Sequence, residues 1–184
     1  MSYKTFDIKG QEVVLRDLQD KGAWCVDGAS KEQTFVLNYP SLGLMINPEK
    51  ETNAYAPDLL IKENGGLADL KTQNTPFFKA GQYGINPQYA VTFNEKDFIR
   101  YTELYRGIEV YFWVDWQTIK FVSSNIEINV LPMIGIWRLS FENMIEAVKK
   151  APLHTYMQRI NDQNGNAKGS YVLDLSTPYF IRVI

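Results

Sequence analysis

The stretch Ala56-Pro-Asp-Leu-Leu-Ile-Lys-Glu-Asn-Gly-Gly-Leu-Ala-Asp-Leu-Lys-Thr-Gln73 carries the clearest structural signal in this chain. Two short runs rich in aliphatic residues, Ala56–Ile61 and Leu67–Gln73, flank Asn64-Gly65. Asn-Gly between two such runs is a strong hairpin signal, because both residue types tolerate the positive φ of a tight turn. The sequence therefore predicts two antiparallel strands joined at Asn64-Gly65.

The pairing of these strands decides which side chains lie together. With Asn64-Gly65 as a two-residue loop, Asp58 faces Lys71. Leu60 then faces Asp69. Opposed residues project from the same face of a sheet, and a strand returns to that face at every second residue. One face then carries Asp58, Asp69, Lys71 and Gln73, and the other carries Leu59, Ile61, Leu70 and Thr72. A loop with any even number of residues preserves this division, whereas an odd loop or a bulge breaks it.

Two carboxylates and an ammonium on one face suit a hard divalent cation. Mg²⁺ prefers oxygen ligands and commonly binds through one or two carboxylates, keeping waters and substrate phosphate as its other ligands. A lysine beside such a site can hold the attacking water or stabilise the charge of the transition state. The pattern predicts metal-assisted hydrolysis of a phosphodiester. The alternative is an ordinary hairpin with a solvated polar face, on which Asp58 and Lys71 form a cross-strand ion pair.

Three helices are expected from hydrophobic periodicity and capping residues. The first covers Thr5–Lys21, with Thr5 as its N-cap. The second covers Glu95–Leu104 after Asn94, and the third covers Phe141–Lys150 after Ser140.

The other expected strands are shorter or less distinct. Ile108–Val114 is nearly continuous in apolar residues, which is typical of a strand in the interior of a sheet. A second Asn-Gly pair, Asn164-Gly165, predicts another hairpin. Further strand predictions are Ala23–Val26, one bent or two short strands in Thr34–Ile46, one or two in Ile126–Leu139, the hairpin arms Tyr156–Ile160 and Tyr171–Leu175, and Tyr179–Ile184. The segment Thr75–Gln88 is expected to be a loop.

Pro57-Asp58 followed by Asp69-Leu70-Lys71 resembles the PD-(D/E)XK nuclease motif. That superfamily includes many restriction enzymes, archaeal Holliday-junction resolvases and the RecB nuclease domain. The resemblance implies an α/β (α+β) fold with a restriction-endonuclease-like core: a helix, a three-strand meander, a helix and a strand, in a mixed central sheet. It spans residues 5–116. Residues 117–184 are then expected to form a strand-rich C-terminal extension packed on this core, within a single domain covering 1–184.

The resemblance also implies roles for individual residues. Asp58 and Asp69 would be metal ligands, with the backbone carbonyl of Leu70 as a third, and Lys71 would be the catalytic lysine. Gln73 matches a glutamine often found two residues beyond that lysine. Many members bring an acid from the first helix, for which Glu12 is the best match and Asp17 the fallback. The implied cofactor is Mg²⁺, with Mn²⁺ as a substitute, and the implied substrate is DNA.

Composition narrows the possible functions. The 184 residues include 19 Lys and Arg and 21 Asp and Glu, for a net charge of −2, which excludes a protein that holds nucleic acid by bulk positive charge. One cysteine, Cys25, and one histidine, His154, exclude an internal disulfide and zinc sites with several His ligands. The absence of a long apolar run and of a signal-like N-terminus leads us to expect a soluble, cytoplasmic protein with no membrane association.

Three functions follow as hypotheses. The first is a Mg²⁺-dependent nuclease acting on DNA, for which a homodimer would be natural if it cuts duplex. The second is a non-catalytic nucleic-acid-binding or assembly protein that keeps the nuclease fold. The third is a small-ligand or protein-interaction domain in which the motif is a coincidence.

Overall fold

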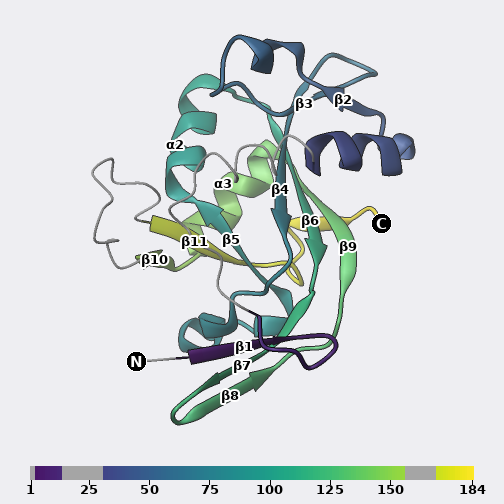
Figure 1. The fold of residues 1–184 in the computed structure, drawn as a ribbon. Coiled ribbons are helices and arrows are strands. Elements are labelled where there is room, and N and C mark those ends of the chain that lie inside the picture. Colours follow the sequence, from purple (N-terminus) through teal and green to yellow (C-terminus); the bar gives the residue numbers. More distant parts are fainter. Residues whose placement is uncertain (1–2, 14–30, 156–168) are drawn as a thin grey trace.

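The computed structural model describes residues 3–13, 31–155 and 169–184 of the chain, which form a mixed α+β fold (Figure 1). Its largest element is a six-stranded mixed sheet. β4 and β6 run parallel, and the other neighbouring strands run antiparallel. In spatial order the strands are β12 (Phe180–Arg182), β9 (Ile134–Leu139), β6 (Glu109–Asp115), β4 (Leu67–Gln73), β3 (Leu59–Ile61) and β2 (Leu44–Ile46).

Two three-stranded sheets flank the large one. The first consists of β1 (Tyr3–Asp7), β7 (Thr118–Ser123) and β8 (Ile126–Asn129), and the second of β10 (Leu153–Thr155), β11 (Gly169–Asp174) and β5 (Ala90–Asn94). In the described part of the chain, four 3₁₀ turns connect these elements: η1 (Pro40–Leu42), η2 (Pro48–Glu51), η3 (Phe78–Tyr83) and η4 (Pro87–Tyr89).

Helices cover both faces of the six-stranded sheet. α2 (Glu95–Leu104) and α3 (Phe141–Lys150) lie on one side, and the helix formed by residues 31–38 lies on the other (Figure 1). The predicted bounds of α2 and α3 are confirmed. Asn94 accepts a hydrogen bond from the backbone N–H of Lys96, and Ser140 accepts one from Asn143, so each helix begins where a side chain caps its free N–H groups.

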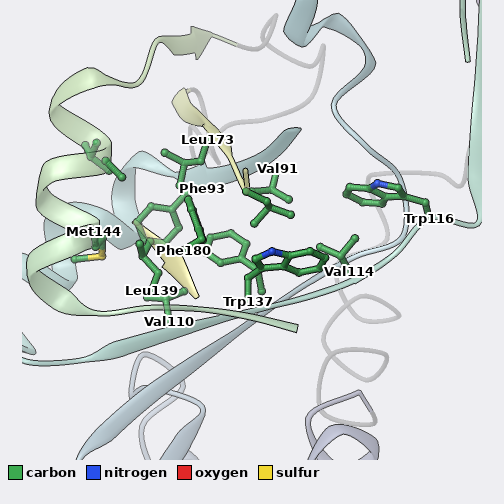
Figure 2. Packing of buried hydrophobic residues seen from close by; sticks show 14 of the residues in the cluster. Val91, Phe93, Val110, Val114, Trp116, Trp137, Leu139, Met144, Leu173 and Phe180 are labelled. Carbon is green, nitrogen blue, oxygen red and sulfur yellow. The ribbon is translucent and has the colours of Figure 1, made fainter. Parts of the chain in front are cut away.

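The two faces of the sheet bury two separate hydrophobic clusters. Successive residues of β6 point to opposite faces. Val110, Phe112 and Val114 therefore pack towards α2 and α3, in the cluster drawn in Figure 2, whereas Tyr111 and Trp113 pack against the helix 31–38. β6 lies between β9 and β4, which confirms the prediction of an interior strand at Ile108–Val114.

The β3–β4 hairpin is confirmed, but its loop is longer than predicted. Leu59 pairs with Ala68 and Leu60 with Leu67, and the loop consists of residues 62–65 between the hydrogen-bonded Ile61 and Gly66. Gly65 has a φ of 68°, as expected for the turn. Because this loop also has an even number of residues, the division of the two faces is preserved. The register is shifted, however, so that its continuation places Asp58 opposite Asp69 and not opposite Lys71.

The predicted helix Thr5–Lys21 is wrong over residues 5–13. Thr5 lies in β1, where it pairs with Phe121 of β7. The chain then turns back at Gly10, with a φ of 76°, and Phe6 forms a bridge with Glu12. Long-range strand pairing has overridden the local periodicity. The rest of that predicted helix and the strand Ala23–Val26 lie outside the described residues.

The strand predicted in the first half of Thr34–Ile46 is also wrong. Residues 31–38 are helical, and only Leu44–Ile46 is a strand. Phe35 and Tyr39 are four positions apart, so they lie on one side of the helical turn, where both rings contact Trp113. A short apolar run does not distinguish a helix from a strand by itself, and here packing against the sheet decides the outcome.

The remaining predictions have mixed outcomes. Ile126–Leu139 forms two strands, β8 and β9, and Tyr179–Ile184 contains β12. β5 and β7 were not predicted. The turn at Asn164-Gly165 and the arm Tyr156–Ile160 lie outside the described residues. Residues 117–184 contribute β9 and β12 to the central sheet itself. Among the described residues, no helix has the length and apolar character needed to cross a membrane.

Candidate functional site

Asp69 and Lys71 project from the same face of β4, as the sequence predicted. Asp69 is almost fully buried, with 2% of its surface exposed. The Lys71 ammonium nitrogen lies 2.8 Å from Asp69 Oδ2 and 2.6 Å from Asp97 Oδ2 of α2. The lysine is thus held between a strand acid and a helix acid in a largely buried position.

Asp58 lies immediately before β3, where the chain enters the hairpin. Its Oδ2 accepts a hydrogen bond of 3.2 Å from the backbone N–H of Leu70, so the carboxylate takes the place of a strand partner for β4. The N–H and C=O of one strand residue point to the same edge. The carbonyl of Leu70 is therefore directed towards the same gap. The structure brings Asp58, Asp69 and the Leu70 backbone together at this point.

A lysine contacts the other carboxylate oxygen of Asp58. Lys50, in η2, forms ion pairs with Asp58 Oδ1 and with Glu32 Oε1, the latter at 2.6 Å. Glu32 belongs to the helix 31–38, and the side chains of all three residues are mostly buried. An acid from the first described helix thus reaches the Asp58 carboxylate through the Lys50 ammonium.

α2 surrounds Lys71 with further polar groups. The Tyr101 hydroxyl lies 3.2 Å from the Lys71 ammonium nitrogen, and Arg100 forms an ion pair of 2.8 Å with Asp97. The cap at Asn94 begins the helix, which places Asp97 in its first turn and Tyr101 one turn later on the same side. We refer to this group as the carboxylate–lysine cluster; it consists of Glu32, Lys50, Asp58, Asp69, Lys71, Asp97, Arg100 and Tyr101.

The charges of the cluster shift the ionisation of its members. Burial raises the pKa of Asp58 to about 7, and the negative charges of Asp69 and Glu32 act in the same direction against the Lys50 hydrogen bond. Burial also disfavours the charged form of Asp69, but the adjacent Lys71 ammonium outweighs it and holds the pKa of Asp69 below its ordinary value. The pKa of Lys71 is raised well above its ordinary value despite burial, because Asp69 and Asp97 stabilise the cation.

Gln73 is on the expected face but is engaged in a structural contact. Its side-chain amide donates to the backbone carbonyl of Thr92 at 2.7 Å and accepts from the Thr92 N–H at 3.3 Å. The residue therefore fastens β4 to β5, the strand that leads directly into α2. Through this contact Gln73 helps to set the position of Asp97 relative to Lys71.

Glu12 is not on a helix, which corrects the premise for choosing it. It lies beside β1 and forms an exposed ion pair of 2.7 Å with Lys4. The fallback, Asp17, lies outside the described residues. Glu32 is the helix acid whose contacts lead to Asp58, through the ion pairs that Lys50 forms with both residues.

Five residues of the cluster were not predicted from the sequence: Glu32, Lys50, Asp97, Arg100 and Tyr101. Their elements are far apart along the chain, and no short motif links them. One partial signal exists, since Asp97 and Tyr101 share a helix face beside a capped N-terminus. Which face that helix presents to β4, however, is decided by packing.

The oxygen donors of Asp58, Asp69 and Leu70 fit a hard divalent cation in chemical type. Asp69 Oδ2 supports this fit, because it is buried and has no directed hydrogen bond among the described residues despite its ion pair with Lys71. Within the same residues no group of three or more His, Cys, Asp or Glu side chains is arranged to hold a metal ion. Lysines are paired with the carboxylates instead.

Comparison with known proteins gives no match. No protein-family model, no curated protein and no solved structure is similar enough to this chain to be matched to it. The function of the site is therefore inferred from its own residues.

Proposed function

We propose that this protein is a Mg²⁺-dependent nuclease that hydrolyses phosphodiester bonds in DNA at a PD-(D/E)XK site. The observation that carries the proposal is the position of the Asp58 carboxylate in the gap beside Leu70, with Asp69 and Lys71 on the adjoining strand. Two carboxylates, a backbone carbonyl and an ammonium close together beside β4 are groups that suit this chemistry.

The order of elements supports the proposal. The helix 31–38 precedes the antiparallel meander β2–β3–β4, and α2 then leads to β6, which lies parallel to β4. Apart from β5 before α2, this order is similar to the helix, three-strand meander, helix and strand of a restriction-endonuclease-like core, with the first helix later in the chain than residues 5–21. In this assignment Glu32 occupies the first helix.

The residues of the site would have different roles in the reaction. Asp58, Asp69 and the Leu70 carbonyl would hold Mg²⁺, which when bound polarises a phosphate oxygen and lowers the pKa of a bound water. Lys71 stays protonated because Asp69 and Asp97 stabilise its charge, so it would act as a fixed cation for developing negative charge and not as a base. Tyr101 and Asp97 would orient that ammonium.

A DNA-nicking assay tests this function. Purified protein is expected to cut or nick DNA with Mg²⁺ or Mn²⁺ and not with a chelator present. Asp69→Ala and Lys71→Ala should abolish cleavage while circular dichroism shows that they remain folded. Lys62→Ala, which removes an exposed lysine from the hairpin loop, is the matched control and should cleave normally. Wild-type protein that never cleaves duplex, single-stranded or branched DNA with either metal would rule the proposal out for those substrates.

A non-catalytic nucleic-acid-binding or assembly protein with the same fold is the second candidate. It is favoured by the pairing of Lys50 and Lys71 with the site carboxylates, which neutralises them without a metal. In that case DNA binding would be the same with and without Mg²⁺, and Asp69→Asn would leave binding unchanged. Sedimentation with and without DNA would show whether either activity involves a homodimer.

A further inference from the structure

Lys50 is placed where it affects any cation that approaches Asp58. Its ammonium contacts Asp58 Oδ1 on one side and Glu32 Oε1 on the other. The other Asp58 oxygen, Oδ2, faces the Leu70 N–H. A metal cation held between Asp58 and Asp69 would therefore contact the same Asp58 carboxylate as the Lys50 ammonium.

Two such cations repel each other strongly in this setting. The side chains of Lys50, Asp58 and Glu32 are 24%, 17% and 15% exposed, so little solvent lies between them to screen their charges. With all of its acids ionised, the carboxylate–lysine cluster holds four carboxylates and three cationic groups, which leaves a net charge of −1. Adding a divalent ion would make it +1, and releasing the Lys50 ammonium would restore neutrality.

The two lysines of the cluster differ in how firmly they are held. Lys71 contacts Asp69, Asp97 and the Tyr101 hydroxyl, on two elements of the core. Lys50 lies on a short 3₁₀ turn, and its ammonium is at the end of a long, flexible side chain. Its ammonium can leave Asp58 by rotation of that side chain without a change in the backbone.

We propose that Lys50 is an internal competitor of the divalent cation: its ammonium neutralises Asp58 and Glu32 in the metal-free protein and is displaced when the metal binds. This inference rests on the proposed metal site at Asp58 and Asp69. It makes Lys50 a residue that sets the metal concentration at which the site fills. The same contact protects the fold from two unpaired carboxylates when no metal is bound.

Mn²⁺ titration followed by calorimetry and by electron paramagnetic resonance tests the inference without using cleavage as the readout. Lys50→Met is expected to bind Mn²⁺ at least about tenfold more tightly than wild type, since a unit charge beside the site is removed. Its metal-free melting temperature should fall and its stabilisation by Mn²⁺ should grow. Lys62→Met removes an exposed lysine and should bind as wild type does.

Lys50→Gln provides the same test if Lys50→Met does not fold, because its neutral amide can still donate to Asp58 and should also bind Mn²⁺ more tightly. Wild type that binds Mn²⁺ with equal or higher affinity than both Lys50 variants would overturn the inference and leave the proposed function standing. A lack of Mn²⁺ binding by all proteins, including Lys50→Gln, would overturn the metal site itself. These two failures are therefore distinguishable.

Discussion

The ammonium nitrogen of Lys71 lies 2.6 Å from a carboxylate oxygen of Asp97, although 26 positions separate the two residues in the chain. The contact joins the strand that carries the nuclease-like motif to the helix that follows it. It gives Lys71 a second acidic partner besides Asp69 and fixes the ammonium from two directions. The geometry of the site therefore depends on how α2 is placed against β4.

Replacing Asp97 with Asn should loosen Lys71 without removing any proposed metal ligand. We expect a loss of about 1–3 kcal/mol in the free energy of unfolding, because a charge-assisted hydrogen bond is weakened in a mostly buried setting. Cleavage should fall about 10- to 100-fold through misplacement of the ammonium, with Mn²⁺ affinity little changed. Glu103→Gln, an exposed change on the same helix, is the control for urea unfolding and for activity. Equal effects of the two substitutions would contradict this role.

Asp58 should make the metal-free protein less stable as pH rises. Its pKa in the fold is raised to about 7 from an ordinary value of 3.8. A carboxyl with a raised folded-state pKa stabilises the fold most below its unfolded value, and that contribution is lost as pH rises through the folded-state pKa. Between about pH 4 and pH 7 this loss is on the order of 1–4 kcal/mol, and Asp58→Asn removes it.

Chemical unfolding of chelator-treated protein at about pH 5 and about pH 8 measures this effect. The free energy of unfolding of Asp58→Asn, relative to that of wild type, should be higher at the higher pH than at the lower pH. Adding Mg²⁺ should benefit wild type more than the variant at the higher pH, since the metal stabilises the ionised carboxylate. Parallel pH profiles for the two proteins would show that Asp58 ionises normally.

The contribution of Asp69 to the free energy of unfolding should have the opposite pH dependence. Its pKa is held below the ordinary value by Lys71, so its ionised form contributes stability above that value and the contribution is lost as pH falls. Asp69→Asn leaves Lys71 with a weaker partner and should cost about 3 kcal/mol at neutral pH. The gap between variant and wild type should narrow in acid. Glu63→Gln in the exposed loop serves as the control, and a gap that widens in acid would contradict the assignment.

Gln73 should contribute to stability through Thr92. Gln73→Ala leaves the N–H and C=O of that residue without these partners, and we expect a loss of about 1–3 kcal/mol. Gln73→Glu can still accept from the N–H but cannot donate to the carbonyl, so its free energy of unfolding should be reduced as well. A variant that cleaves poorly yet unfolds like wild type would instead indicate direct participation of Gln73 in catalysis.

Phe35 should anchor the helix 31–38 to the sheet. Its side chain is fully buried against Tyr39, Tyr111 and Trp113, and Phe35→Ala should cost about 3–5 kcal/mol. Leu37→Ala, on the exposed side of the same helix, should change the free energy of unfolding by less than about 0.5 kcal/mol. Thermal and urea unfolding of both variants checks the contrast, and similar losses would show that this face is not the packed one.

Local sequence signals were sufficient where a structural feature depends on neighbouring residues. Asn94 and Ser140 marked the starts of α2 and α3 because a cap acts within its own helical turn. Asn64-Gly65 marked the β3–β4 hairpin for a similar reason. The alternation along β4 placed Asp69 and Lys71 on one face, and an even loop kept Asp58 with them.

Local signals failed where a distant partner decided the conformation. Thr5 pairs with Phe121 of β7, and Phe35 packs on Trp113 of β6, so residues more than seventy positions away made the first segment a strand and the second a helix. β5 and β7 were missed because their strand character comes from pairing with β11 and β1. Short segments have weak intrinsic preferences that such contacts readily override.

The sequence by itself determined the hairpin, the two capped helices and the shared face of Asp58, Asp69 and Lys71. Only the tertiary structure decided the register that places Asp58 beside Leu70 and Asp69. It also decided which residues of other elements contact this group: Glu32, Lys50, Asp97 and Tyr101. The physical reason is range: caps, turns and alternation act over a few residues. The charges that surround a buried carboxylate are supplied by whichever elements pack against its strand.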